Sequence, residues 1–177
     1  MHNKDKKVKV LLLFPNFQMY EIIGVDATQP PLSLGYLAGM LKANNIEYTV
    51  IDAACLKLNE HQIIQRIREF NPDVICITTN IAIAYASLLH SQLIRKEFPD
   101  IKIIIGGPWA TAEYEKLLKN KHADYVIIGE GEYTLIELIK DVFESGLSPN
   151  HIKSLAYLEN NTVKVNERRP LIEKLDD

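Results

Sequence analysis

Cysteine is scarce in this chain: only Cys55 and Cys76 occur among the 177 residues. They form no C-x-x-C pair and no three-cysteine motif, so this chain does not itself hold a zinc ribbon or a cysteine-ligated iron–sulfur cluster. Cys76 lies within the apolar run VICIT, which favours burial as a small hydrophobic residue. So few cysteines, together with a charged start (MHNKDKKVKV) that predicts neither a signal nor a transit peptide, indicate a reduced cytoplasmic protein.

A net positive charge and long apolar runs are also lacking. The formal net charge is −3 and the pI is near 6.0, which argues against nucleic acid as a partner because a polyanion needs a basic face. The longest apolar runs, such as VLLLF, have the length of a strand and not of a membrane span. With 47% hydrophobic and 24% charged residues, the composition is that of a soluble globular domain with a substantial core.

Apolar runs alternate with helical patterns along most of the chain. The runs are rich in β-branched residues and are continuous, as in strands buried on both faces of a sheet. This alternation predicts an α/β, Rossmann-like (flavodoxin-like) fold, with a five-stranded parallel sheet in the order 2-1-3-4-5 and helices on both faces. The expected strands are 8–14, 47–53, 71–79, 101–107 and 123–129, and the expected helices are 34–45, 59–70, 82–98, 111–120 and 132–146.

Local signals refine this prediction. Asn59 and Gln62 are placed as a capping box, and Gly146 is placed to end the last helix. After residue 148 the pattern changes to a β-hairpin centred on Asn160 and Asn161, followed by RRPLIEKLDD, which is typical of a linker. We therefore divide the chain into an α/β domain (1–148) and a hairpin with a linker (149–177).

The segments that follow the strands point to a ligand. In such a sheet a ligand binds at the carboxyl ends of the strands, where the winding direction reverses. After the first strand comes a long loop, Pro15–Pro31, whose length favours a functional role. Glycines and short hydroxyl residues follow the others, where backbone must approach a ligand closely. These segments are Thr78-Thr79-Asn80, Gly106-Gly107-Pro108 and Gly129-Glu130-Gly131-Glu132.

Each of these features also has a purely structural explanation. Gly-Gly-Pro is compatible with a simple tight turn, and the threonines with the end of a strand. Gly35, Ala38 and Gly39 form a small face that would let a helix pack closely on the sheet. Glu130 and Glu132 at a helix start suit the macrodipole without any catalysis. Their predicted co-location at one edge of the sheet is what favours a bound ligand.

Familiar phosphate and nucleotide motifs do not account for this pattern. GEGEYT resembles the start of a dinucleotide fingerprint, but it ends in Thr134 and follows the fifth strand instead of the first. A G-x-x-x-x-G-K-[ST] loop is missing, as are the acidic residues of a phosphoryl-accepting receiver site and the hydroxyl-rich loop expected for flavin mononucleotide.

Taken together and in this order, the loops resemble a known family. PPLSLGYLAGMLKANNIEYTVIDA, PDVICITTN, KIIIGGPWAT, ADYVIIGEGEYTLIELI and RPLIEKLDD are similar to the N-terminal cobalamin-binding domain of cobalamin-dependent radical S-adenosylmethionine (SAM) enzymes. That group contains methyltransferases and anaerobic magnesium-protoporphyrin monomethyl ester cyclases. The resemblance implies a cobalamin-binding module, in cis or in trans to a radical SAM barrel that holds SAM and a four-iron–four-sulfur cluster, and not an enzyme active alone.

The resemblance also gives a ligation state and a site. Aligning the glycine of the cobalt-ligating motif D-x-H-x-x-G with Gly35 places its aspartate at Pro30 and its histidine at Leu32. It therefore implies base-off cobalamin with no protein histidine on cobalt, and the five histidines of the chain are expected at the surface. No catalytic or metal-ligating residue is assigned. The implied cofactor-binding residues are Pro31, Leu32, Ser33, Gly35, Ala38, Gly39, Thr78, Thr79, Asn80, Gly106, Gly107, Pro108, Gly129, Glu130 and Gly131.

Two other functions stay open. The first is a cofactor-free domain that docks a radical SAM catalytic barrel, for which Trp109 and Tyr114 would supply an aromatic surface unless they pack in the core. The second is an independent α/β enzyme that uses Glu130 and Glu132 as acid and base. Because these two residues are two positions apart at a helix start, their side chains are expected to point away from each other.

Overall fold

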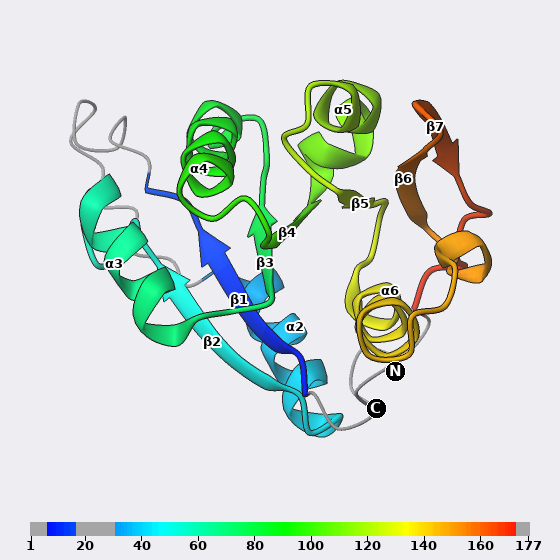
Figure 1. The fold of residues 1–177 in the computed structure, drawn as a ribbon, viewed down its shortest axis with the longest axis horizontal. Helices are drawn as coiled ribbons and strands as arrows, with labels where there is room; N and C mark the ends of the chain where they lie inside the picture. Colours follow the sequence, from blue (N-terminus) through cyan, green and yellow to red (C-terminus); the bar gives the residue numbers. More distant parts are fainter. Residues whose placement is uncertain (1–6, 17–30, 173–177) are drawn as a thin grey trace.

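The computed structural model describes residues 7–16 and 31–172, which form one seven-stranded sheet in the order β2-β1-β3-β4-β5-β6-β7 (Figure 1). The first five strands are parallel and the last two antiparallel. The predicted α/β class, strand order and C-terminal hairpin are therefore confirmed. The strands are β1 (Lys9–Phe14), β2 (Glu47–Asp52), β3 (Val74–Thr78), β4 (Lys102–Gly106), β5 (Tyr125–Ile127), β6 (Leu155–Glu159) and β7 (Thr162–Val165).

Helices cover both faces of the sheet (Figure 1). One face carries α2 (Leu32–Ala43) and α6 (Glu132–Glu137), and α6 continues as the π-helix η1 (Leu138–Glu144). The other face carries α3 (Glu60–Phe70), α4 (Ala84–Glu97) and α5 (Pro108–Lys119), and a short 3₁₀ turn, η2 (Pro149–His151), precedes β6. Across the described part of the chain, none of these helices is both long and apolar enough to pass through a bilayer.

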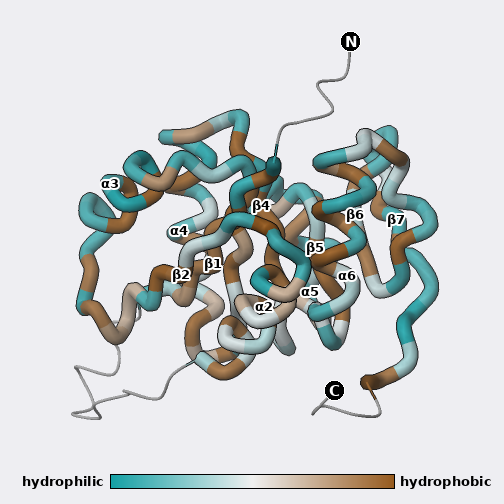
Figure 2. Tube along the Cα trace, turned by 90° about the horizontal axis from the view of Figure 1, so that it is seen from below, coloured by the Kyte–Doolittle hydropathy of each residue, from teal (hydrophilic) through white to brown (hydrophobic). Residues whose placement is uncertain are grey.

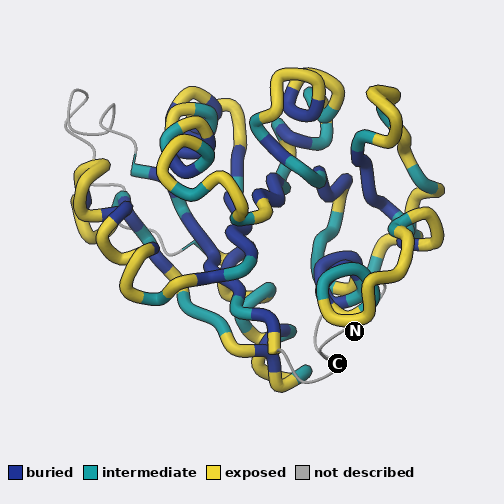
Figure 3. The backbone as a smooth tube through the Cα atoms, in the orientation of Figure 1, coloured by how far each residue is buried: buried dark blue, intermediate teal, exposed yellow. Residues whose placement is uncertain are grey.

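Each central strand contributes side chains to two separate cores. Leu12, Cys76 and Ile104 pack under α2 and α6, whereas their strand neighbours, such as Leu11 and Ile103, pack under α3, α4 and α5. The buried strands lie between exposed outer helical surfaces in Figure 3, and the same strands are the hydrophobic centre of Figure 2. The predicted burial of Cys76 is confirmed.

Local sequence signals are also confirmed. The Asn59 side chain accepts a hydrogen bond from the Gln62 N–H, and the Gln62 side chain accepts one from the Asn59 N–H, both at 2.9 Å. Asn160 and Asn161 have φ values of 50° and 60°, as a two-residue hairpin turn requires. Gly146, with φ of 69°, follows the last helical turn.

Several predicted helix boundaries differ from the structure by two or three residues, and the last helix also differs in its hydrogen bonding. Helix α5 begins at Pro108 and not at residue 111, because a proline is well suited to the first helical position, where no N–H is needed. The last helix is an α-helix only as far as Glu137 and then continues with π-helical bonding to Glu144. An apolar repeat near 3.6 residues does not distinguish these two bonding patterns.

The C-terminal hairpin extends the main sheet and does not stand apart from it. Strand β6 pairs antiparallel with β5, joining Val126 to Ala156 and Ile127 to Leu155. The Thr134 hydroxyl donates a hydrogen bond to the Lys153 carbonyl at 3.0 Å and ties α6 to the start of the hairpin. The division at residue 148 stays a prediction about the chain's organisation.

The predicted surface position of the histidines is wrong for His90. Its side chain is 3% exposed, and its Nδ1 lies 2.8 Å from the Ala86 carbonyl oxygen, to which it donates a hydrogen bond. Burial lowers the pKa of His90 below its usual value. His61 and His151 are exposed, His122 is half-buried with its Nδ1 3.1 Å from the Ser91 hydroxyl, and His2 lies outside the described residues.

The buried His90 makes a prediction about acid stability. Because its folded pKa lies below the unfolded value of about 6.5, the unfolded chain binds a proton that the native chain does not. The free energy of unfolding should therefore fall as the pH drops below about 6.5. Urea titrations at several pH values between 7.5 and 5 should show a smaller fall for His90→Gln than for the wild type. An equally steep fall in the variant would contradict this assignment.

Candidate functional site

A cavity of about 220 Å³ lies at the carboxyl ends of β3, β4 and β5, beneath α2 and α6. This is the edge at which an α/β sheet of this winding is expected to hold a ligand. The cavity brings together a large part of the predicted site from four separate segments of the chain. The predicted residues that line it are Ser33, Thr78, Gly106, Gly107, Pro108, Gly129, Glu130 and Gly131.

The other predicted residues do not line this cavity. Leu32 begins α2 with its side chain 74% exposed, and a Cβ at Gly35 or Gly39 would meet nothing within 4 Å. Thr79 is buried, and the Asn80 side chain accepts hydrogen bonds from two N–H groups of the β3–α4 turn. Pro31 and Ala38 are also outside the lining. Of the predicted loop Pro15–Pro31, residues 17–30 lie outside the described part of the chain.

Sequence reasoning missed most of the apolar wall. Leu34 and Leu37 face the cavity from α2, and Cys76, Ile104 and Ile127 face it from the strands. Their periodicity showed which side of each element is buried, but the same pattern is produced by packing alone. The remaining lining residues, also missed as ligand contacts, are Ile77, Glu132 and Leu135.

The charged groups of the wall are two carboxylates with different surroundings. One oxygen of Glu130 accepts a hydrogen bond from the Ile172 N–H at 2.7 Å. Oε2 of Glu132 is buried and has no hydrogen-bond partner among the described residues. Burial raises the pKa of the Cys76 thiol to about 12, so Cys76 is a neutral thiol at physiological pH and not a thiolate nucleophile.

The two glycines that follow β4 play different roles. Gly107 has φ of +106°, and a Cβ there would lie 2.3 Å from the Thr79 carbonyl oxygen, so only glycine fits this close approach of two backbones. A Cβ at Gly106 would meet only the Ile127 Cβ, at 3.9 Å. Gly107 is therefore required by the fold, whereas Gly106 leaves space in the cavity that a larger side chain would fill.

The segment after β7 is held against α6 and the residue before β6. The Arg169 N–H donates to the Ser154 hydroxyl at 2.8 Å, and its guanidinium forms an ion pair with Glu137. The bond from the Ile172 N–H to Glu130 then brings this segment to the mouth of the cavity. One cavity-lining residue thus also anchors the C-terminal segment.

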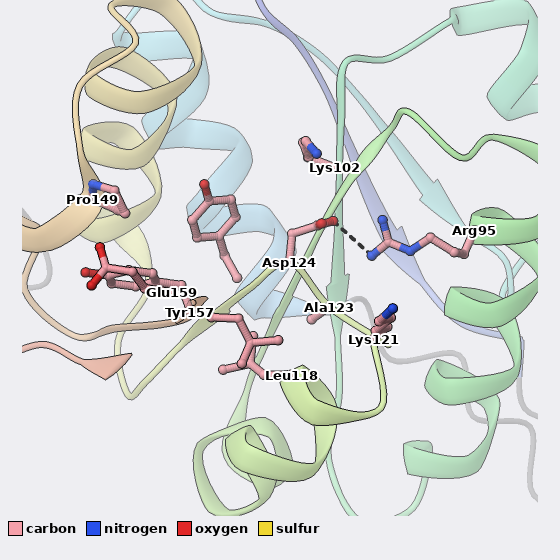
Figure 4. Close-up of a pocket in the computed structure, with 11 residues that line it drawn as sticks. Arg95, Lys102, Leu118, Lys121, Ala123, Asp124, Pro149, Tyr157 and Glu159 are labelled. Carbon is pink, nitrogen blue, oxygen red and sulfur yellow. Dashed lines mark hydrogen bonds and ion pairs between the residues drawn. The ribbon is translucent and has the colours of Figure 1, made fainter. Parts of the chain in front are cut away.

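A second, more open hollow of about 510 Å³ lies at the opposite edge of the sheet (Figure 4). There Asp124 accepts hydrogen bonds from the Arg95 guanidinium (2.9 Å) and the Ile103 N–H (2.8 Å), which ties the starts of β4 and β5 to α4. Asp124 already has two partners within the fold, whereas the buried Arg95 Nε has none among the described residues. Ligands of parallel sheets bind at the other edge. We therefore assign the 220 Å³ cavity as the candidate site.

The described part of the site contains no cluster of metal ligands. None of the histidines in residues 7–16 and 31–172 lines the cavity, and no group of three or more His, Cys, Asp or Glu side chains in those residues could hold an ion. Trp109 and Tyr114 are partly buried and pack against the core. This packing reduces the aromatic surface that the docking hypothesis would use, and that hypothesis stays a prediction.

Comparison with known proteins identifies similar chains. Residues 22–139 match the model of the family described as the B12 binding domain. The chain is 31% identical over 173 residues to an uncharacterized methyltransferase of Pyrococcus horikoshii, covering 97% of this chain and 37% of that protein. It is 30% identical over 176 residues to the anaerobic magnesium-protoporphyrin IX monomethyl ester cyclase of Rubrivivax gelatinosus, covering 96% and 31%. It thus spans about a third of the length of these relatives.

Solved structures share the fold. The cobalamin-dependent SAM radical enzyme OxsB, with aqua-cobalamin and SAM bound, matches with a TM-score of 0.81 at 21% identity, covering 94% of this chain and 23% of that one. The radical SAM methyltransferase TsrM of Kitasatospora setae matches with a TM-score of 0.76 at 19% identity, covering 90% and 30%. At these identities the match establishes the architecture only.

The two glycines after β4 give a matched test of the geometry. Gly107→Ala should lower the free energy of unfolding by at least about 2 kcal/mol, because a Cβ meets the Thr79 carbonyl and the positive φ is strained. Gly106→Ala should change it by no more than about 1 kcal/mol, because its Cβ makes only an ordinary contact. Chemical denaturation of both variants would measure the difference, and equal effects would contradict the distinct roles assigned to them.

Proposed function

Because the chain belongs to the B12-binding domain family, we propose that it binds cobalamin, with the nucleotide tail in the cavity under α2 and the corrin ring at the carboxyl edge of the sheet. One observation carries the proposal: four chain segments singled out by their sequence converge on a single cavity at that edge. Its volume of about 220 Å³ is below the roughly 300–1,000 Å³ of pockets that enclose a drug-sized ligand, which suits the tail and not the macrocycle.

The residues of the cavity fit such a tail. Gly106, Gly129 and Gly131 present backbone in place of side chains, and Leu34 and Leu37 supply an apolar wall for a flat base. The hydroxyl groups of Ser33 and Thr78, which also line the cavity, are hydrogen-bonding groups for the polar parts of the tail. Within the cavity, the proposed site also includes Gly107, Pro108 and Glu130. Outside the cavity, we extend the proposed site to Pro31, Leu32, Gly35, Ala38, Gly39, Thr79 and Asn80.

We further propose that cobalamin binds base-off and without a protein imidazole on cobalt. When the glycine of D-x-H-x-x-G is aligned with Gly35, Leu32 falls at the position of the ligating histidine, and none of the described histidines lines the cavity. When bound, cobalamin supplies a nucleophilic cobalt centre suited to methyl transfer, and the protein supplies position and an apolar environment. The chain's own contribution is therefore to hold the tail and to leave the lower face of the corrin free.

The longer protein is proposed to be a radical SAM enzyme of the methyltransferase or oxidative-cyclase type. Relatives with these names are about three times as long as the segment that matches this chain. In the proposal, a catalytic barrel in cis or in trans binds SAM and a four-iron–four-sulfur cluster. The domain described here does not catalyse the reaction alone.

Cofactor retention tests the proposal. The purified chain mixed with hydroxocobalamin and desalted should keep the visible spectrum of a corrinoid. Gly106→Leu should abolish retention, because its side chain fills the cavity without meeting backbone. Ala112→Leu, which adds the same side chain at an exposed position of α5, is the matched control and should retain the cofactor. A colourless wild-type protein would reject the proposed function.

The ligation state has a separate test. Reduction of the bound cofactor to paramagnetic cobalt(II) should give an electron paramagnetic resonance spectrum without nitrogen superhyperfine splitting, because no imidazole or benzimidazole nitrogen occupies the lower position. Splitting that changes when the protein is labelled with ¹⁵N would show a protein nitrogen on cobalt. Splitting that does not change would show the cofactor's own base there. Either outcome would overturn the base-off, histidine-free state.

A further inference from the structure

Glu132 presents a buried acceptor that the fold does not use. It is the first residue of α6 and one of the residues that line the cavity. Its Oε2 is buried without a hydrogen-bond partner among the described residues. Glu130, two positions earlier in the same wall, has its carboxylate bonded to the Ile172 N–H at 2.7 Å. The fold therefore gives the Glu130 carboxylate a hydrogen-bond donor and leaves Oε2 of Glu132 without one.

An unpaired buried carboxylate oxygen opposes folding, because desolvation of a charged group is costly unless a donor compensates for it. The lining contains no lysine, arginine or histidine that would pair with Glu132. The positive end of α6 favours the negative charge but gives Oε2 no hydrogen bond. No residue among 7–16 and 31–172 supplies the missing donor, and a ligand in the cavity would be placed to do so.

The chemistry of the wall restricts that donor. An ionised carboxylate only accepts hydrogen bonds, and a second carboxylate, Glu130, lies in the same wall. A phosphate group would be repelled by both charges, so the partner is a neutral O–H or N–H group. In cobalamin these are the hydroxyl groups of the ribose in the nucleotide tail and the amides around the corrin. The small volume of the cavity favours the tail.

We propose that Oε2 of Glu132 accepts a hydrogen bond from a ribose hydroxyl of the nucleotide tail and thereby selects corrinoids that carry a complete tail. This inference rests on the proposed function, because it names the contact by which the same cavity recognises its ligand. It makes Glu132 a specificity-determining residue of a site whose other walls are mostly apolar side chains or glycine backbone. The phosphate of the tail then lies away from the start of α6.

The test compares two corrinoids. Dissociation constants for cobalamin and for cobinamide, which has the corrin amides but lacks the nucleotide, are measured by equilibrium dialysis with the wild type, Glu132→Ala and Glu132→Gln. Glu132→Ala should weaken cobalamin binding by about tenfold or more, as expected for a lost hydrogen bond to a charged group, and should change cobinamide binding less than about twofold. Glu132→Gln, which keeps an acceptor oxygen, should lie between the wild type and Glu132→Ala.

Two further measurements separate recognition from a structural role. Glu144→Gln, which removes a charge at the exposed end of η1, is the matched control and should leave both dissociation constants unchanged. The midpoint of urea unfolding of Glu132→Gln without cofactor should equal or exceed that of the wild type, because the oxygen that is replaced has no partner to lose. A clearly lower midpoint would show that Glu132 holds the fold together, and would overturn the proposal.

The remaining outcomes are equally decisive. Wild-type affinity for cobalamin in Glu132→Ala would overturn the proposal while leaving cobalamin binding intact. An equal loss for cobalamin and cobinamide would place the donor on the corrin, which also overturns it. Failure of the wild type to bind either corrinoid would reject the proposed function itself, and is thus distinct from failure of the Glu132 contact.

Discussion

The site depends on a close approach of two backbones at the rim of the sheet. The Thr79 N–H donates to the Gly106 carbonyl at 2.8 Å, which carries the pairing of β3 and β4 one residue past the end of β3. Gly107 then turns against the Thr79 carbonyl in a conformation open only to glycine, and α5 starts at the next residue. The chain therefore leaves the rim at once toward the face that carries α5, and the cavity lies at the ends of β3 and β4 on the α2 side.

The resulting cavity has few polar groups in its lining. Most of its lining residues are aliphatic or glycine, and its charged residues are two glutamates, Glu130 just before α6 and Glu132 at its start. One carboxylate is bonded within the fold and the other has an open oxygen. In a mostly apolar pocket, burial of the ligand's apolar surface supplies affinity, and the few polar groups supply specificity by fixing the ligand's orientation. Cys76 belongs to the apolar part, since burial keeps its thiol protonated.

The sequence was most informative where one local rule dominates. Continuous β-branched runs defined the parallel strands, the Asn59–Gln62 pair defined a helix start, and two asparagines defined the hairpin turn. It was less informative where tertiary contacts decide. His90 is buried because of the position of α4 on the sheet, and a lone histidine in a helix does not show which side is covered. In the same way, the glycine-rich loops predicted which edge of the sheet holds the cavity. They did not predict that Gly35 and Gly39 lie outside it, because contacts between residues far apart in the sequence decide which residues line the cavity.

Glu130 belongs at once to the wall of the cavity and to the attachment of Ile172. Because the carboxylate is shared, ligand binding and attachment of the C-terminal segment are thermodynamically linked. A ligand that competes for this carboxylate would weaken its bond to Ile172, and breaking that bond would leave the carboxylate free to contact the ligand. Linkage requires the two effects to be equal in free energy. A ligand that contacts Glu130 would therefore change how firmly this single hydrogen bond holds Ile172.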